Sequence, residues 1–208
     1  MIQNLGAFLL LSAVVICTPG PDTALIIRNT LAAGRRAGVA TAVGIIGGIT
    51  VWTLAASLGL AALLSASEPV FRAIQLAGAA YLVYLGAQSL WWARRGRERA
   101  NTGKTVAMLT PRRALRQGLL SNLGNPKIAV FFVSLLPQFV TGGSRSFVAL
   151  LVLGCLFSAL GLAWLTLYAV AVARMARLLT GAVRRTVDAL TGLVLVALGL
   201  RLATERSP

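Results

Sequence analysis

The sequence predicts an all-α polytopic membrane protein with six transmembrane helices, arranged as two inverted repeats of three helices each. Three observations lead to this fold class. Of the 208 residues, 57% are hydrophobic and 12% are charged. Apolar stretches of about 20 residues, the length that a helix needs to cross a hydrocarbon core, recur along the whole chain. Finally, the first hydrophobic stretch of each half is interrupted by proline and carries a charged residue.

Six hydrophobic segments define the predicted spans, and polar or charged residues mark where each one ends. The N-terminal segment has no positively charged leader region and no clear cleavage site, so we expect it to remain in the mature protein. The predicted spans lie near residues 3–31, 39–64, 68–92, 118–140, 146–173 and 186–204.

Prolines should break the first and the fourth span inside the bilayer. Proline lacks a backbone N–H and clashes with the preceding helical turn, so the freed amide and carbonyl groups need other partners. Pro19 and Pro21 predict a break at 19–22. Pro126 predicts a second break at 124–127. Broken helices at matching positions of two halves are typical of the substrate site of a secondary transporter.

A polar segment that contains glycine and proline divides the chain into two halves. It covers residues 93–117, between an N-terminal repeat, 1–92, and a C-terminal repeat, 118–208. An odd number of spans in the first half inverts the second half relative to it. We therefore predict that the two broken helices cross the membrane in opposite directions.

Positive charge gathers on one side of this predicted layout. Fifteen of the twenty Lys and Arg residues, beginning with Arg28, fall in or beside the loops after the first, third and fifth spans. Positively charged loops tend to stay in the cytoplasm, so both chain termini are predicted to lie outside it. The net charge of +15 does not indicate nucleic-acid binding, because the cations form short clusters between apolar spans without interleaved aromatic residues.

Asp22 and Lys127 are the acid and the base that lie well inside the predicted spans. Counting about 1.5 Å per residue from the cytoplasmic edge places them at similar depths, so we expect that they can meet. An unpaired charge at this depth costs about 2.5 kcal/mol or more. Two interpretations stay open. The residues form a permanent ion pair that fastens two bent helices, or Asp22 binds a proton or an ammonium while Lys127 binds a carboxylate.

Three neighbours of these charges complete the predicted site. Asn125 and the free backbone amides near Gly20 are expected to bind a substrate carboxylate and to shape the helix breaks. Thr23 belongs to the same polar stretch as Asp22. We expect the site to bind a small zwitterion, with alternating access around the two breaks.

The same residues resemble a known family of transporters. In order and spacing, the chain is similar to the lysine-exporter (LysE) family, in its threonine and homoserine efflux (RhtB) branch, through the elements Pro19-Gly20-Pro21-Asp22-Thr23, Gly34-Arg35-Arg36-Ala37-Gly38, Asn125-Pro126-Lys127 and Leu135-Leu136-Pro137-Gln138-Phe139. The resemblance extends over about the whole chain. It implies an exporter of amino acids or their derivatives in the inner (plasma) membrane, driven by antiport of protons and without a cofactor.

Other classes of function fit the sequence less well. The chain has no histidine, no paired carboxylates and no clustered metal ligands, which argues against an enzyme and against a metal site. The alternative function that we keep is export of another small cationic or amphipathic metabolite.

Two further features concern packing. Cys17 and Cys155 do not form a CxxC motif, and we interpret them as small buried residues. The small residues Gly44 and Gly48 favour close packing of helices within the monomer, with a homodimer interface as the alternative.

Overall fold

The computed structural model describes residues 2, 4–59, 68–99, 109–140, 146–176 and 181–204. This part of the chain is helical apart from turns and one isolated β-bridge between Ile2 and Val140. The predicted all-α fold class, with several apolar helices, is therefore confirmed. In chain order the elements are α1 (Leu5–Cys17), α2 (Pro21–Ser57), α4 (Glu68–Arg99), α5 (Pro111–Leu123), α6 (Pro126–Val130), the π-helical η1 (Phe131–Leu135), the 3-10 helix η2 (Leu136–Phe139), α7 (Ser146–Ala176) and α8 (Gly181–Thr204).

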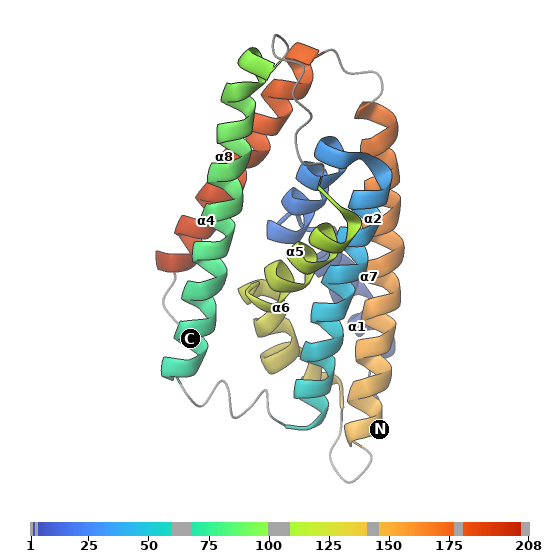
Figure 1. The fold of residues 1–208 in the computed structure, drawn as a ribbon. Helices are drawn as coiled ribbons and strands as arrows, with labels where there is room; N and C mark the ends of the chain where they lie inside the picture. Colours follow the sequence, from blue (N-terminus) through green and yellow to red (C-terminus); the bar gives the residue numbers. More distant parts are fainter. Residues whose placement is uncertain are drawn as a thin grey trace.

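The long helices run roughly along one common axis (Figure 1). α2 turns back on itself near one end of the molecule, and its longer arm runs antiparallel to α7. α4 and α8 lie side by side as a second pair. Both chain termini are toward the end opposite the turn in α2.

The turn in α2 joins the end of the first predicted span to the second one. Ala33 and Gly34 have non-helical backbones there, and Gly34 has a φ of 79°, a left-handed conformation that favours glycine. The two arms are so close that a Cβ on Gly38 would lie 2.1 Å from Oγ1 of Thr30. The connection is thus shorter than the segment 32–38 that separates the two predicted spans.

The helix that contains the predicted start of the fourth span, residue 118, begins earlier, because α5 starts at Pro111. Thr110 caps this helix by accepting a hydrogen bond from the backbone amide of Arg113 at 3.3 Å. Likewise, α4 continues to Arg99. Arginine is a good helix former, so a run of arginines did not mark the helix boundary.

Glycines allow α2 and α5 to approach closely. A Cβ on Gly44 would lie 2.0 Å from the carbonyl oxygen of Leu115, and one on Gly118 would lie 2.2 Å from that of Thr41. Gly48 faces α5 in the same way. These small residues therefore serve packing within the monomer, as the sequence favoured.

A cluster of buried aromatic side chains holds the segment after the second break in place. Phe131 and Phe132 of η1 are almost fully buried, as are Phe8 of α1 and Phe157 of α7. The ring centroids of Phe131 and Phe157 are 4.5 Å apart. This cluster ties the broken helix to α1 on one side and to α7 on the other.

The α4–α8 pair packs against both broken regions. Leu25 of the first arm of α2 shares a buried cluster with Leu82 of α4 and Leu195 of α8. In addition, a Cβ on Gly78 of α4 would lie 2.4 Å from the carbonyl oxygen of Gly124, which belongs to the second break. Movement of either break is therefore expected to disturb this pair.

Several described helices have the length and composition of membrane spans. Pro21–Ser57 and Phe147–Ala176 are each long and apolar enough, and Pro111–Leu123 with Pro126–Phe139 forms a third candidate bent by 54°. Shorter apolar helices cover Leu5–Cys17, Leu76–Gln88 and Ala189–Arg201.

The prediction that both cysteines are buried is wrong. Cys17 and Cys155 are exposed on the surfaces of α1 and α7. Helix faces that point toward lipid are apolar as well, so an apolar neighbourhood in the sequence does not distinguish them from the core.

Candidate substrate site at two broken helices

The chain leaves the helical conformation at both places that the sequence predicts, and the two breaks are built alike. At the first break, α1 ends at Cys17 and α2 begins at Pro21, with Pro19 in the exposed segment between them. At the second, α5 ends at Leu123 and α6 begins at Pro126. A proline thus occupies the first turn of the second helix in each case, where its missing N–H removes no intrahelical hydrogen bond.

The carboxylate of Asp22, in the first turn of α2, binds the second break. Oγ of Ser121 donates to one carboxylate oxygen at 3.0 Å. The side-chain amides of Asn122 and Asn125 donate to the other oxygen at 2.9 and 3.0 Å. Hydrogen bonds to a charged group contribute about 1.5–3 kcal/mol each, and the N-terminus of α2 adds a favourable dipole. Asp22 is 9% exposed, and these contacts compensate the burial of its charge.

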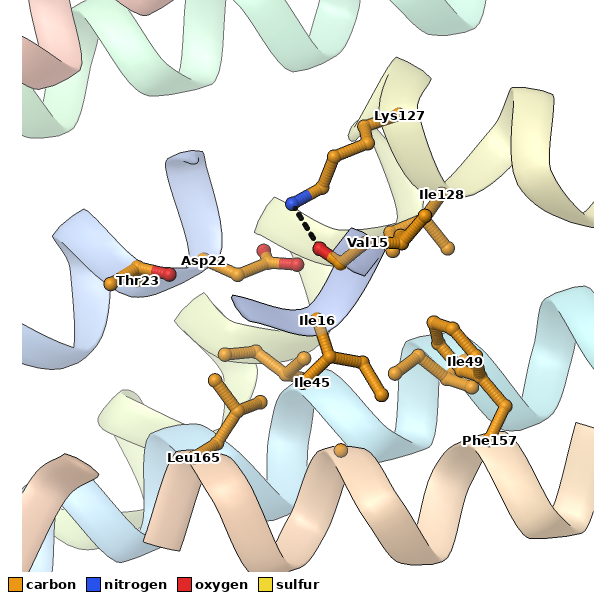
Figure 2. A pocket seen from close by; sticks show the side chains of 11 residues that line it. Val15, Ile16, Asp22, Thr23, Ile45, Ile49, Lys127, Ile128, Phe157 and Leu165 are labelled. Atoms are coloured by element: carbon orange, nitrogen blue, oxygen red, sulfur yellow. Dashed lines mark hydrogen bonds between the residues drawn. The ribbon is translucent and has the colours of Figure 1, made fainter. Parts of the chain in front are cut away.

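The ammonium of Lys127, in the first turn of α6, binds the first break. Nζ donates to the carbonyl oxygens of Val15 at 3.0 Å and Thr18 at 2.9 Å; Figure 2 shows the bond to Val15. Carbonyl groups at the end of a helix lack intrahelical partners, so the end of α1 is a suitable place for a cation. The backbone of Gly20 is also close, since a Cβ there would lie 3.4 Å from Nζ.

The charged residue of each break therefore contacts the other break, and we call these interactions the crossed contacts. The described residues show no direct ion pair between Asp22 and Lys127. The structure thus does not contain the permanent ion pair that the sequence left open. Each charge is instead stabilised by polar groups of the opposite helix break.

A small cavity lies between the two breaks, with a volume of about 30 Å³. Its polar lining comes from Asp22, Thr23 and Lys127, while Val15 contributes from α1 (Figure 2). This volume has room for water but not for an amino acid, so the surrounding helices must separate before a substrate binds. The remaining lining residues are apolar: Ile16, Ile45, Ile49, Ile128, Phe157, Gly161 and Leu165.

Sequence reasoning missed two residues that contact the buried acid. Ser121 and Asn122 lie in the last turn of α5 and are fully or almost fully buried. The available signal was the presence of two polar side chains in an otherwise apolar segment just before the proline break. Their contact with Asp22 joins positions about a hundred residues apart in the chain.

A second polar cluster lies farther along the first arm of α2. Arg28, which the sequence placed beside a cytoplasmic loop, is only 9% exposed and donates to the side chains of Gln88 in α4 and Gln117 in α5. Asn29 donates to Gln117 at 3.0 Å and to Thr41 at 2.9 Å. This cluster connects both arms of α2 with α4 and α5.

Two proline-broken helices with a charged residue at each break, in a part of the chain that is described as almost entirely helical, are typical of a membrane transporter. Comparison with known proteins identifies its family. A family model described as "LysE type translocator" matches residues 13–206, so this chain belongs to the LysE family of translocators.

The individual relatives are described as membrane proteins or as an efflux protein. The chain is 30% identical to the uncharacterized membrane protein YrhP of Bacillus subtilis over 96% of this chain and 98% of YrhP. It is 35% identical to an uncharacterized membrane protein of Pseudomonas aeruginosa over 91% of this chain and 90% of that protein. A leucine efflux protein of Salmonella typhimurium is 29% identical over 67% of this chain and 64% of its own length. No solved structure matches the chain.

Proposed function

We propose that this protein exports amino acids or their derivatives from the cytoplasm across the inner (plasma) membrane in exchange for protons. The observation that carries the proposal is the pair of crossed contacts. A carboxylate at one helix break and an ammonium at the other line the same cavity. Membership of a translocator family supports transport, and the relatives named for leucine efflux support an amino acid as the cargo.

The transport cycle that we propose uses six spans in two inverted repeats, with both termini outside the cytoplasm. α1 and the first arm of α2 form one broken span, and α5 with α6, η1 and η2 forms its counterpart in the second half. Two features support the proposed orientation. The termini lie toward the same end of the molecule (Figure 1), and the exposed Arg35 and Arg36 follow the turn at the opposite end.

Lys127 is the proposed partner of the substrate carboxylate. Its ammonium has three hydrogens, and two of them are directed at the carbonyl oxygens of Val15 and Thr18. The residue also lines the cavity, so the third hydrogen is available to a carboxylate that enters there. A carboxylate is a stronger acceptor than a neutral carbonyl, and its binding is expected to loosen the hold of Lys127 on α1.

Asp22 is the proposed site of proton binding. As a carboxylate it accepts hydrogen bonds from Ser121, Asn122 and Asn125. Protonation removes the negative charge that makes these three bonds strong, which frees the second break to move away from α2. Proton entry from outside and substrate exit to the same side would then occur in alternation around the cavity.

The test of this proposal is transport in inside-out membrane vesicles with an imposed proton gradient. A panel of labelled amino acids is supplied outside the vesicles, and accumulation is measured with the gradient intact and after it is collapsed by an ionophore. At least one amino acid should accumulate in a gradient-dependent way. Absence of accumulation for the whole panel, with purified protein shown to be inserted, would contradict the proposed function.

A further inference from the structure

α7 presents an unusual surface to the cavity. Phe157, Gly161 and Leu165 all line it, and their spacing of four residues places them on one face of the helix. A glycine therefore lies between two large apolar residues. The missing side chain leaves a notch in the wall of the cavity, which we call the α7 notch.

Close helix packing does not account for Gly161. On the same helix, a Cβ on Gly154 would lie 2.2 Å from Thr53 of α2, so that position requires glycine. A Cβ on Gly161 would lie 3.4 Å from Cδ1 of Ile46 and 3.8 Å from Cδ1 of Ile49, which are ordinary contact distances. Glycine inside a helix costs about 0.5–1 kcal/mol relative to alanine. The absence of a side chain at this buried position needs another reason.

The lining of the cavity has a polar part, and its remaining residues, including those around the notch, are apolar. Asp22, Thr23 and Lys127 supply the polar lining, whereas Ile45 and Ile49 of α2, together with Phe157 and Leu165 of α7, supply an apolar lining (Figure 2). An amino acid whose carboxylate is bound by Lys127 would therefore direct its side chain toward the apolar wall. Burial of an aliphatic side chain there is favourable by about 0.8 kcal/mol per CH₂, whereas a polar side chain would lose its hydration without a partner.

We propose that the α7 notch receives the substrate's side chain and that Gly161 sets its permitted size, which selects amino acids with branched aliphatic side chains. This inference rests on the proposed function, because it assumes that Lys127 holds the carboxylate group of the substrate. The cavity of about 30 Å³ is too small for an amino acid, so it must enlarge before a substrate enters. In the enlarged cavity, a Cβ at position 161 occupies space that a leucine side chain needs and an alanine side chain does not.

The experiment measures labelled leucine and alanine accumulation in inside-out vesicles for the wild type, Gly161→Ala and Gly161→Val. Relative to wild type, the ratio of leucine to alanine transport should fall about threefold for the alanine variant and about tenfold for the valine variant. Gly47→Ala and Gly47→Val are the matched controls. Gly47 lies on α2 outside the cavity lining, where a Cβ would lie 3.5 Å from Leu119, so these variants should keep the wild-type ratio.

Three outcomes would overturn the inference. One is an unchanged ratio in both Gly161 variants when their insertion equals that of the Gly47 variants. The second is an equal change of the ratio in the Gly47 variants. The third is a wild-type protein that transports polar amino acids and neither leucine, isoleucine nor valine, which would leave the proposed export of amino acids intact. Failure of the proposed function itself is distinguishable, because no amino acid would then accumulate.

Discussion

The two helix breaks are built alike, yet they hold their charged residues by different means. The carboxylate of Asp22 is buried and is bound by three side chains that the second break supplies. The ammonium of Lys127 is partly buried, is bound by two backbone carbonyl groups and also lines the cavity. Side-chain donors form a dedicated site for a negative charge, whereas the carbonyl end of a helix accepts any cation that reaches it.

This difference suggests a division of labour. The contacts of Asp22 depend on its charge, so protonation changes them directly. The contacts of Lys127 use two of its three hydrogens, so the proposed binding of a substrate carboxylate would change them directly. Because the contacts are crossed, either event affects both breaks, which is a physical route for coupling two fluxes.

The largest expected effect comes from exchanging the two charges. In the double variant Asp22→Lys with Lys127→Asp, the new carboxylate would face the carbonyl oxygens of Val15 and Thr18, while the new ammonium would face side-chain amide donors. We expect loss of transport and a loss of about 3–5 kcal/mol in stability, as for buried charges left without partners. Thermal unfolding in detergent micelles and transport in vesicles measure these effects.

The control for the exchange is the double neutralisation Asp22→Asn with Lys127→Gln, which removes both charges without placing like groups together. It should be clearly more stable than the exchanged variant. A direct ion pair would tolerate the exchange, so an exchanged variant with wild-type stability would show that the crossed contacts are not the arrangement in the membrane.

The next largest effect concerns the coupling of substrate accumulation to the proton gradient. In Asp22→Asn, the new amide oxygen can accept from Asn122 and Asn125, and its NH₂ group can donate to Ser121 after the hydroxyl rotates. The cost in stability should therefore be small, about 1–2 kcal/mol, because charge-assisted bonds become neutral ones. Gradient-driven accumulation should be abolished, while exchange of labelled for unlabelled substrate across the membrane continues.

Ser121→Ala is the matched control for coupling, since it removes one donor to Asp22 and keeps the acid. It should retain gradient dependence at a lower rate. Wild-type gradient dependence in Asp22→Asn would remove Asp22 from the proton pathway.

The sequence predicted those parts of the fold that have local causes. A single proline interrupts a helix, because its ring clashes with the preceding turn and it has no backbone N–H. The breaks at 19–22 and 124–127 were therefore located correctly from the sequence. The start of α5 at Pro111 was missed, because arginine-rich segments are compatible with both a loop and a helix. The depth and charge of Asp22 and Lys127 pointed to the region where the cavity lies.

What the sequence did not predict depends on contacts between distant segments. Asp22 and Lys127 were expected to meet, and they do line one cavity. The hydrogen-bond partners of each charge, however, become visible only when α1, α2, α5 and α6 are placed together. Arg28 shows the same limit. Its charge indicated a loop near the cytoplasm, whereas Gln88 and Gln117 bind it in a buried cluster.

Substitution of Lys127 is expected to change stability less than substitution of Asp22, because the partners of Lys127 are backbone groups that remain in every variant. Lys127→Gln can still donate one or two hydrogen bonds to Val15 and Thr18, so folding should be nearly unaffected. The substrate concentration for half-maximal transport should rise about tenfold, which corresponds to the loss of one charge-assisted bond of about 1.4 kcal/mol. Lys127→Arg keeps the charge and should recover part of the affinity. A lower maximal rate with unchanged half-saturation would argue against contact with the carboxylate.

The last prediction concerns membrane topology, and its variants should change transport least. It tests whether the two broken helices cross the membrane in opposite directions. That relation requires residue 103, in the connection between the two halves, and the far end of α2 to lie on opposite sides of the membrane. Gly103→Cys and Leu58→Cys probe these places, in a background with Cys17→Ser and Cys155→Ser. Both native cysteines are exposed, and Leu58 is 61% exposed at the end of α2, so transport should be nearly unchanged.

An impermeant thiol reagent should label position 103 from the cytoplasmic side and position 58 from the outside. Labelling of both from one side would mean that α4, which lies between the two positions in the chain, does not cross the membrane as proposed, and the likeness of the two breaks would then not reflect inverted repeats.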